Sequence, residues 1–314
     1  MRPGVSSRRS IIVSFLVLLL PSCSGPAPEP ASEAPVRKFL LIGLDGIRTD
    51  VLVMADTPNI DALIADGVFS DTAVTRSPTV SGPGWSSMLT GVWADKHGVL
   101  GNDFTENNYD EYPDFLTRIE QVDPDLQTFA VVDWLPLGGD DSGGPLISDA
   151  VDTLIGFDGY DGGFAAADSQ SLEIAVQHLT TQDPDAAFVY FGNTDEIGHE
   201  FDSLAPEYRA EIEKADRYVG ALIAALQARP TYDSEDWLIL MSTDHGRRDD
   251  GGHGGDSELE KRIFFLANGP TIVSGELPEA PEIVDVAVTA LVHLGIGIDP
   301  AWSLDGEPIL RYRD

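Results

Sequence analysis

The sequence predicts an α/β fold, a three-layer sandwich in which helices flank a mostly parallel central sheet. The first observation is a set of five apolar runs, each of strand length and most of them ending in polar residues: 38–45, 126–133, 186–193, 236–243 and 262–269. Runs without polar alternation are typical of strands buried on both faces of a parallel sheet. The second observation is that stretches of helical periodicity separate these runs, and alternating strands and helices favour this fold class.

The elements follow one another along the chain in a regular order. The expected helices lie at 59–65, 169–179, 206–229 and 283–294, and Gly67 and Gly295 follow the first and the last of them. Apolar residues recur in these stretches at helical spacing, and a glycine after the last turn is a common helix end. Residues 102–168 are rich in glycine and aspartate, so we expect part of this region to form loops over a functional site. No break in composition indicates a second domain, and 37–314 is predicted as a single α/β domain.

Residues 1–22 are predicted to be an export signal that takes no part in the fold. Three arginines, Arg2, Arg8 and Arg9, precede an apolar run at 11–20. This run is too short to span a membrane, and a basic start before a short apolar segment is typical of a signal peptide. The arginine pair also resembles a twin-arginine signal, so the export route stays open.

Cys23 is the only cysteine in the chain, and it follows Leu20-Pro21-Ser22. This setting resembles a bacterial lipobox, in which the cysteine carries the lipid; an ordinary signal peptide with an incidental cysteine is the alternative. We therefore expect an exported protein, periplasmic or at the cell surface, attached to a membrane only by lipid at Cys23. Residues 23–36 are rich in proline, alanine and glutamate, which predicts a flexible tether.

Composition excludes two classes of protein. The 314 residues include 53 acidic and 19 basic side chains, for a net charge of −34. Binding to a nucleic acid duplex through its phosphates requires a basic face that so few cations cannot supply. Disorder is excluded because 42% of the residues are hydrophobic. The oligomeric state is left open by the sequence.

Six candidate metal ligands follow predicted strands. They are Asp45 after the first strand, Asp195 and His199 after the strand at 186–193, and Asp244, His245 and His253 after the strand at 236–243. The carboxyl ends of parallel strands gather functional groups at one edge of a sheet. Aspartate and histidine without cysteine are ligands for divalent cations, with Zn²⁺ the first choice and Mn²⁺ the second. Each residue alone is better explained by a turn or a structural role, so the prediction of two divalent metal ions depends on the combination.

Ser81 is the candidate nucleophile. It lies in a turn rich in serine, proline and glycine that leads into a short helix expected to begin near Pro83 or Gly84. The N-terminus of a helix favours an anion, and a serine beside a divalent cation is readily activated as a nucleophile. The alternative is that the Ser81 hydroxyl only caps the helix.

The motifs around these residues resemble the alkaline phosphatase superfamily, and within it the type I phosphodiesterase/nucleotide pyrophosphatase family. The resemblance extends from Phe39 to Gly306 and rests on five motifs in order: GLDGIR at 43–48, PTVSGP at 78–83, TG at 90–91 with KHGV at 96–99, DEIGH at 195–199, and TDHG at 243–246 followed by His253. It implies an alkaline phosphatase-like fold and a hydrolase in which Ser81 attacks small phosphate esters and forms a covalent intermediate. It also divides the metal ligands into two sets, Asp195 with His199 and His253, and Asp45 with Asp244, His245 and Ser81.

Substrate contacts are implied less directly. The family places an asparagine three residues after the nucleophile, where this chain has Gly84, whose backbone N–H is the remaining donor. Asn102 matches another family position near the substrate, with turn formation as the alternative. Trp134 follows a predicted strand and either lines a substrate pocket or packs in the core. Arg247 and Arg248 either contact a substrate phosphate or neutralise the acidic residues that follow them.

Three other functions stay open. Sulfatases share the fold, but their nucleophile lies in a C/S-x-P-x-R sequence, and Trp85 occupies the arginine position here. A transferase would pass the phosphoryl group to an alcohol after the same first step. A non-catalytic metal-binding surface protein would keep the scaffold without the reaction.

Overall fold

The structure is a computed structural model, and it describes Met1, Gly4 and residues 34–275, 277 and 280–313. Residues Pro35–Asp314 form one compact unit, distinct from Met1–Ala34. The predicted export signal, Cys23 and nearly all of the predicted tether lie outside the described residues. Among the residues searched, no helix combines the length and the apolar character needed to cross a membrane.

One sheet of seven strands forms the centre of the unit formed by Pro35–Asp314. Its strands are β1 (Val36–Leu44), β2 (Val68–Val74), β3 (Thr128–Val132), β4 (Thr153–Gly156), β5 (Ala186–Phe191), β6 (Glu235–Ser242) and β7 (Arg262–Asn268). Their order across the sheet is β2-β7-β6-β1-β5-β3-β4. All pairs are parallel except those that β7 makes with β2 and β6. The strands β6, β1 and β5 are therefore parallel neighbours at the middle of the sheet.

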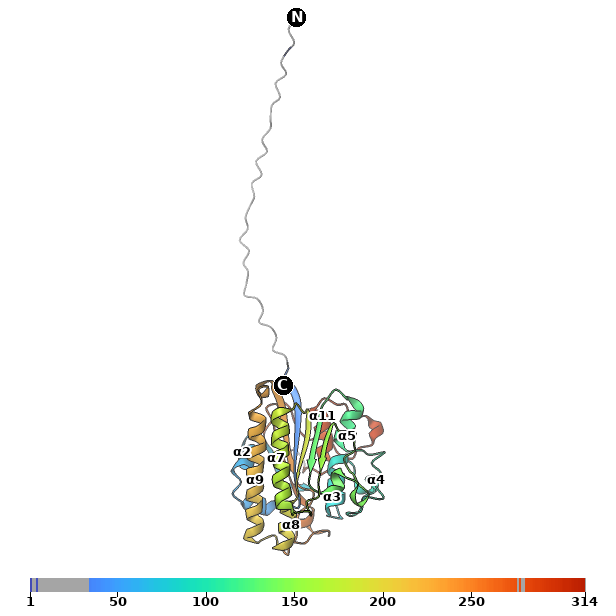
Figure 1. The fold of residues 1–314 in the computed structure, drawn as a ribbon, viewed down its shortest axis with the longest axis vertical. Helices are drawn as coiled ribbons and strands as arrows, with labels where there is room; N and C mark the ends of the chain where they lie inside the picture. The colour runs from blue at the N-terminus through green and yellow to red at the C-terminus, as the bar shows by residue number, and fades with distance from the viewer. Residues whose placement is uncertain (2–3, 5–33, 276, 278–279, 314) are drawn as a thin grey trace. The chain divides into compact units, whose positions relative to one another are not determined.

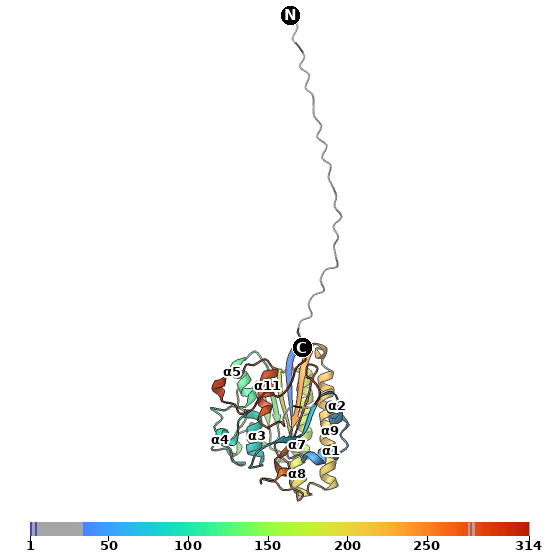
Figure 2. The ribbon, with the colours of Figure 1, turned by 180° about the vertical axis from the view of Figure 1, so that it is seen from behind.

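Helices cover both faces of this sheet. They are α1 (Thr49–Met54), α2 (Pro58–Asp66), α3 (Ser81–Thr90), α4 (Ala94–His97), α5 (Phe115–Val122), α6 (Leu135–Gly138), α7 (Phe164–Thr181), α8 (Asn193–Glu200), α9 (Pro206–Gln227), α10 (Glu258–Lys261) and α11 (Asp285–His293), with short 3₁₀ turns at Asp141–Gly143, Tyr232–Ser234 and Pro300–Trp302. Figures 1 and 2 show α2, α7 and α9 on one side of the strands and α3, α5 and α11 on the other. The predicted fold class, a three-layer α/β sandwich, is confirmed.

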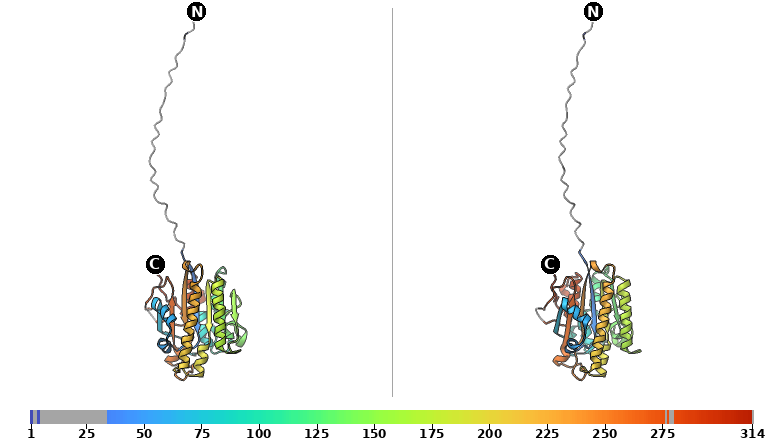
Figure 3. Two further views of the ribbon diagram at one scale, coloured as in Figure 1. Left: turned by 60° about the vertical axis from the view of Figure 1, so that its left-hand side comes forward. Right: turned by 90° about the vertical axis from the view of Figure 1, so that its left-hand side faces the viewer.

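The two helical layers pack on opposite faces of β1. Leu40 and Ile42 belong to a buried cluster with residues of α2, α7 and α9, whereas Phe39 and Leu41 belong to one with residues of α3, α5 and α11. Figure 3 shows α7 and α9 side by side along the sheet. Burial on both faces explains why the first strand is an unbroken apolar run, since neither face needs polar side chains.

Several elements differ from the sequence prediction. The edge strands β2 and β4 were not predicted, because both are short and carry half-exposed residues that weaken the apolar pattern. The region 102–168 contains α5, β3, α6 and β4 and is not only loop. Helix α3 begins at Ser81 and not near Pro83, because Gly84 N already donates to Val80 O at 3.0 Å and closes the first turn.

Candidate metal centre and active site

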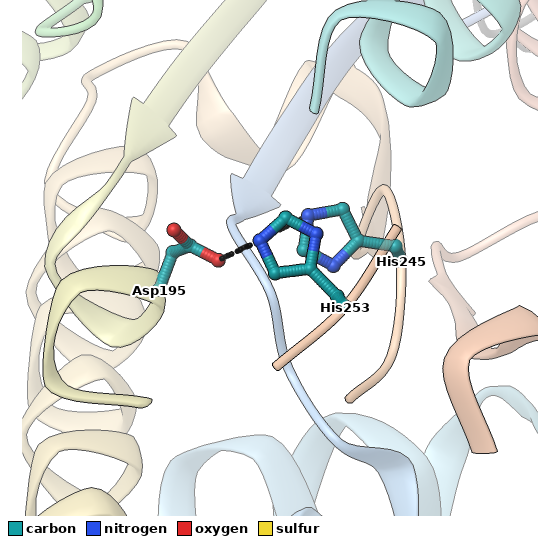
Figure 4. Close-up of side chains that lie close together, drawn as sticks. All are labelled: Asp195, His245 and His253. Atoms are coloured by element: carbon teal, nitrogen blue, oxygen red, sulfur yellow. Dashed lines mark ion pairs between the residues drawn. The ribbon is translucent and has the colours of Figure 1, made fainter. Parts of the chain in front are cut away.

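The six predicted metal ligands lie together at the carboxyl end of the central strands. Asp45 directly follows β1, Asp195 lies in α8 after β5, and Asp244 and His245 follow β6. His253 lies in the loop before α10. Because β5, β1 and β6 are parallel neighbours, residues far apart in the sequence end at one edge of the sheet. Figure 4 shows the Asp195 carboxylate facing the ring of His253, which lies over the ring of His245.

The donor atoms form two overlapping groups. One contains Asp195, His245 and His253 and the other contains Asp45, Asp244 and His245, and within each group the donor atoms lie within 4.8 Å of one another. His245 is common to both: its Nε2 lies 3.3 Å from Asp244 Oδ2, 3.7 Å from Asp45 Oδ1 and 3.9 Å from Asp195 Oδ1. The groups are therefore adjacent and joined by one imidazole.

His199 lies at the outer edge of the first group. Its Nε2 is 3.3 Å from Asp195 Oδ2 and 2.9 Å from His253 Nε2, and 47% of its side chain is exposed. The resemblance assigned His199, and not His245, to the cation held by Asp195 and His253. In the structure both imidazoles reach Asp195, His245 from the buried side and His199 from the solvent side.

Backbone carbonyls orient two of the imidazoles. His245 Nδ1 lies 3.0 Å from Gly246 O, and His253 Nδ1 lies 2.8 Å from Thr79 O. A carbonyl only accepts hydrogen bonds, so Nδ1 carries the proton in each ring and Nε2 keeps a free lone pair. This arrangement of the second nitrogen is the usual one for metal-binding histidines.

Asp45 and Asp244 each present one unpartnered oxygen at the centre. Trp85 Nε1 and Tyr190 Oη donate to Asp45 Oδ2 at 2.9 and 2.6 Å, and Gly46 N donates to Asp244 Oδ1 at 3.1 Å. Asp45 Oδ1 and Asp244 Oδ2 are buried and have no hydrogen-bond partner. A buried carboxylate oxygen without a partner is costly, and a bound cation removes that cost. The residues present therefore fit a pair of divalent cations.

The charges of the centre repel one another in the absence of a cation. Burial, and then the charge of Asp195, raises the pKa of Asp45 to about 7, and burial with the charge of Asp45 raises that of Asp244 well above its usual range. Burial, and then His253, lowers the pKa of His245. Burial would also raise the pKa of Asp195, but the hydrogen bond to His199 and the charge of Arg247 hold it below its ordinary value. The centre thus favours neutral imidazoles, the form that binds metal.

Arg247 supports Asp195 from behind. Its Nη2 donates to Asp195 Oδ1 at 2.6 Å and to Asp195 O at 3.0 Å, and its Nη1 donates to Gly251 O at 2.8 Å. Both alternatives from the sequence are wrong for Arg247, because the side chain is fully buried against a metal ligand. Arg248 does pair with an acidic neighbour, Asp250.

Ser81 is the first residue of α3, and its hydroxyl faces the metal centre. Its Oγ lies 3.3 Å from His245 Nε2. Val80 occupies the N-cap position, and no side chain caps the helix. The interpretation of Ser81 as a helix cap is therefore wrong, and its hydroxyl remains available at the positive end of the helix.

The two predicted amide contacts differ in their geometry. Asn102 Oδ1 accepts a hydrogen bond from Gly82 N at 2.8 Å, which leaves its Nδ2 free to donate into the cavity beside Ser81. Gly84 lies elsewhere, because a Cβ added to it would be 2.8 Å from Asp244 O. Its N–H donates within α3 to Val80 O. The expectation that Gly84 N–H contacts substrate is therefore not met.

A cavity of about 110 Å³ opens onto the centre. It is lined by Asp45, Ser81, Asn102, Trp134, Tyr160, Phe164, Tyr190, Gly192, Asp195, Glu196, His199 and His253. Trp134 combines its two expected roles, since it lines the cavity and packs edge-to-face on Phe104 at 5.8 Å between ring centres. His97 lies outside the lining, where burial lowers its pKa to about 4 and its Nε2 contacts Ser87 Oγ, as expected of a structural histidine.

Sequence reasoning missed the residues that support the ligands. Trp85 and Tyr190 lie in apolar stretches and read as core residues, yet both hydroxyl and indole N–H reach Asp45. The one signal for Tyr190 is its register, because it pairs with Gly43, two residues before Asp45. Glu196, Tyr160 and Phe164 were not singled out either, since nothing in their local sequence indicates that they meet at the cavity.

Fold and donor set together define an alkaline phosphatase-like α/β protein with two adjacent metal-ligand groups. The chain belongs to the type I phosphodiesterase / nucleotide pyrophosphatase family, whose model matches residues 39–152 and 145–249. This confirms the predicted family.

Relatives and solved structures are similar over most of the chain. Human ectonucleotide pyrophosphatase/phosphodiesterase family member 7 is 24% identical over 260 residues, which cover 75% of this chain and 53% of that protein. The catalytic subunit of human GPI ethanolamine phosphate transferase 3 is 28% identical over 142 residues, 45% of this chain and 12% of that protein. This chain spans about half the length of the first of these relatives.

Two solved structures show the same fold. Murine ectonucleotide pyrophosphatase / phosphodiesterase 5, in complex with AMP, superposes with a TM-score of 0.66 at 16% identity, over 88% of this chain and 100% of that chain. A 2-O GAG sulfatase superposes with a TM-score of 0.68 at 14% identity, over 85% of this chain and 72% of that chain.

Proposed function

We propose that this protein is a metal-dependent hydrolase, a two-metal phosphoesterase that cleaves small phosphate esters through a covalent intermediate on Ser81. The observation that carries the proposal is the convergence on one cavity of the Ser81 hydroxyl, at the N-terminus of α3, and the unpartnered Asp45 Oδ1. A nucleophile beside paired metal ligands is the arrangement that phosphoryl transfer requires.

The residues assign a place to each cation. Asp195, His253 and His199 would hold one, and Asp45, Asp244 and Ser81 the other, with His245 between the two groups. Oxygen and imidazole donors without thiolate favour Zn²⁺, with Mn²⁺ as the second choice. When bound, the cations supply positive charge that stabilises an ionised serine and the negative charge that develops on the phosphoryl and leaving oxygens.

The reaction then has two halves. Ser81 Oγ loses its proton to solvent and attacks phosphorus, so that the bond from Oγ to phosphorus forms while the bond to the leaving oxygen breaks. The leaving oxygen takes a proton from solvent. Water next attacks the phosphorylated Ser81 and releases the product, which regenerates the hydroxyl. Asn102 Nδ2, held toward the cavity by the contact of Oδ1 with Gly82 N, donates to a phosphoryl oxygen.

Three other functions share the scaffold. A sulfatase is disfavoured because Trp85, at the position of the sulfatase arginine, donates to Asp45 and does not reach the cavity lining. The similarity to a GPI ethanolamine phosphate transferase keeps a transferase open, which would release phosphate esters of an added alcohol. A non-catalytic role is disfavoured because all six Asp and His ligands are present.

The test is metal analysis followed by turnover of three aryl esters, a phosphate monoester, a phosphate diester and a sulfate. We expect about two divalent ions per chain and cleavage of a phosphate ester. Ser81→Ala should lose several orders of magnitude in turnover and still bind metal, whereas Ser169→Ala, on the exposed face of α7, should retain full activity. Cleavage of the sulfate alone, or an active Ser81→Ala variant, would overturn the proposal.

The proposed location is outside the cytoplasm, with the chain exported and attached to a membrane through lipid at Cys23. The strongly acidic composition supports small phosphate esters over nucleic acid strands as substrates, since a net charge of −34 repels polyanions. Labelling with a radioactive fatty acid tests the anchor, because label should enter the native chain and be absent from Cys23→Ser. Label in both chains, or in neither, would contradict it.

A further inference from the structure

A second hollow adjoins the metal cavity and shares its wall. This groove has a volume of about 550 Å³ and is lined by Gly159, Tyr160, Gly163, Phe164, Ala165, Asn193, Glu196, Ile197, His199 and Glu200. Four of these residues, Tyr160, Phe164, Glu196 and His199, also line the metal cavity. A molecule with its phosphate at the metal centre can therefore extend its organic group along the groove.

Aromatic rings form one wall of this groove. Tyr160 and Phe164 pack edge-to-face with their ring centres 4.9 Å apart, and Tyr160 is 67% exposed. The Phe164 ring has a fixed place, because a Cβ added at Gly159 or at Gly192 would lie 2.5 or 2.6 Å from it. Trp134 adds a further aromatic surface where the groove meets the metal cavity. The wall therefore presents π surface to whatever enters.

The charged side chains of the groove are acidic. Glu196 and Glu200 line it, and neither the groove nor the metal cavity has a lysine or arginine among its lining residues. Within the part of the chain that the structure describes, the Glu196 carboxylate forms no hydrogen bond or ion pair. Burial, and then the nearby charge of Glu196, raises the pKa of Tyr160, so the carboxylate lies close to that ring.

We propose that this groove binds the cationic end of the substrate, an alkylammonium group esterified to the phosphate that occupies the metal centre. The proposal rests on the proposed function, because the phosphate is placed by the metals. Aromatic faces attract ammonium groups, and a carboxylate without a partner adds Coulomb attraction in a site that water leaves. A polyphosphate would instead bring further negative charge toward Glu196 and Glu200 with no cation on the wall to receive it.

The experiment compares two aryl diesters of one shape. One is the p-nitrophenyl ester of phosphocholine, and the other carries 3,3-dimethylbutanol, in which carbon replaces the charged nitrogen. For the metal-loaded protein we expect kcat/KM to favour the choline ester by about 10- to 30-fold, the factor that a desolvated ammonium on an aromatic face supplies. Glu196→Gln and Tyr160→Ala should each bring the ratio toward one. Asp161→Asn, which removes a carboxylate outside both linings, should leave the ratio as in the wild type.

The outcomes separate this inference from the proposed function. Equal kcat/KM for the two diesters overturns the cationic groove and leaves the phosphoesterase standing. Preference for the p-nitrophenyl ester of thymidine monophosphate over the choline ester also overturns it, in favour of a nucleotide.

If no ester is cleaved, the proposed function fails, and binding decides the groove. Calorimetry on metal-loaded Ser81→Ala then compares phosphocholine with 3,3-dimethylbutyl phosphate. We expect tighter binding of phosphocholine, and equal affinities would overturn the inference.

Discussion

Replacing Tyr190 with phenylalanine removes one hydroxyl from the shell of the metal centre. In the structure that hydroxyl donates to Asp45 Oδ2 at 2.6 Å, and Trp85 Nε1 supplies the only other donor to this oxygen. A hydrogen bond to a charged group contributes about 1.5–3 kcal/mol. Because Trp85 still holds the same oxygen, we expect a loss in metal affinity of about 10- to 100-fold, the usual cost of removing a group that orients a ligand.

The assay is a metal titration of the metal-free protein, followed by turnover of an aryl phosphate ester at saturating metal. Tyr190→Phe should need more metal for half-maximal activity and should recover much of its rate at saturation, because Asp45 Oδ1 still faces the site. The matched control is Tyr218→Phe, which loses a hydroxyl that bonds Ser169 Oγ at 2.9 Å on the other side of the sheet. This control should titrate as the wild type does.

Two results would refute the reasoning. Wild-type metal affinity in Tyr190→Phe would show that Asp45 needs no second donor to bind metal. An equal loss in Tyr218→Phe would show that the effect is a general loss of stability and does not pass through Asp45.

Three further predictions follow from the same contacts. A Cβ at position 198 would lie 2.4 Å from Arg247 Nε, so Gly198→Ala should displace Arg247 from Asp195 and weaken metal binding about tenfold; unchanged affinity in a metal titration would contradict this. Removal of metal by a chelator should lower the midpoint of thermal unfolding and Zn²⁺ should restore it, since ligands that bind only the folded state stabilise it; a midpoint indifferent to metal would count against the two-cation centre. Although burial opposes it, the buried ion pair with Arg229 lowers the pKa of Glu235 to about 2 from 4.5, so its stabilising contribution is complete above pH 4.5 and is lost as the pH falls through 2. Urea unfolding should therefore show a steeper loss of stability over this range in the wild type than in Glu235→Gln, and parallel curves would contradict the assignment.

The sequence was sufficient for the parts of the fold that depend on burial and strand direction. Strands β1, β5 and β6 are apolar over their whole length because helices cover both faces, and each ends before an aspartate that the carboxyl edge of the sheet brings into the site. The ligand set was predictable for the same reason. Asp45, Asp195 and Asp244 are polar residues at the ends of buried strands, where a structural role alone explains them poorly.

The remaining features depend on contacts between segments that sequence patterns do not pair. Tyr190 has the pattern of any core aromatic residue, and only its register opposite Gly43 places its hydroxyl on Asp45. Arg247 lies beside acidic residues in the sequence, but the missing side chain at Gly198 lets it turn inward to Asp195. Such roles arise from packing geometry, which neither composition nor periodicity records.

The order of the sheet decides when the metal centre can exist. Each group of donors combines residues that follow β6, which ends at Ser242, with a residue that follows β1 or β5. A chain that ends before β6 therefore contains neither group in full, and parallel strands so far apart in the sequence pair late because closing the long intervening segments costs entropy. Metal uptake is thus a reporter of completed folding: a newly made molecule retains its ions only once the whole central sheet has assembled.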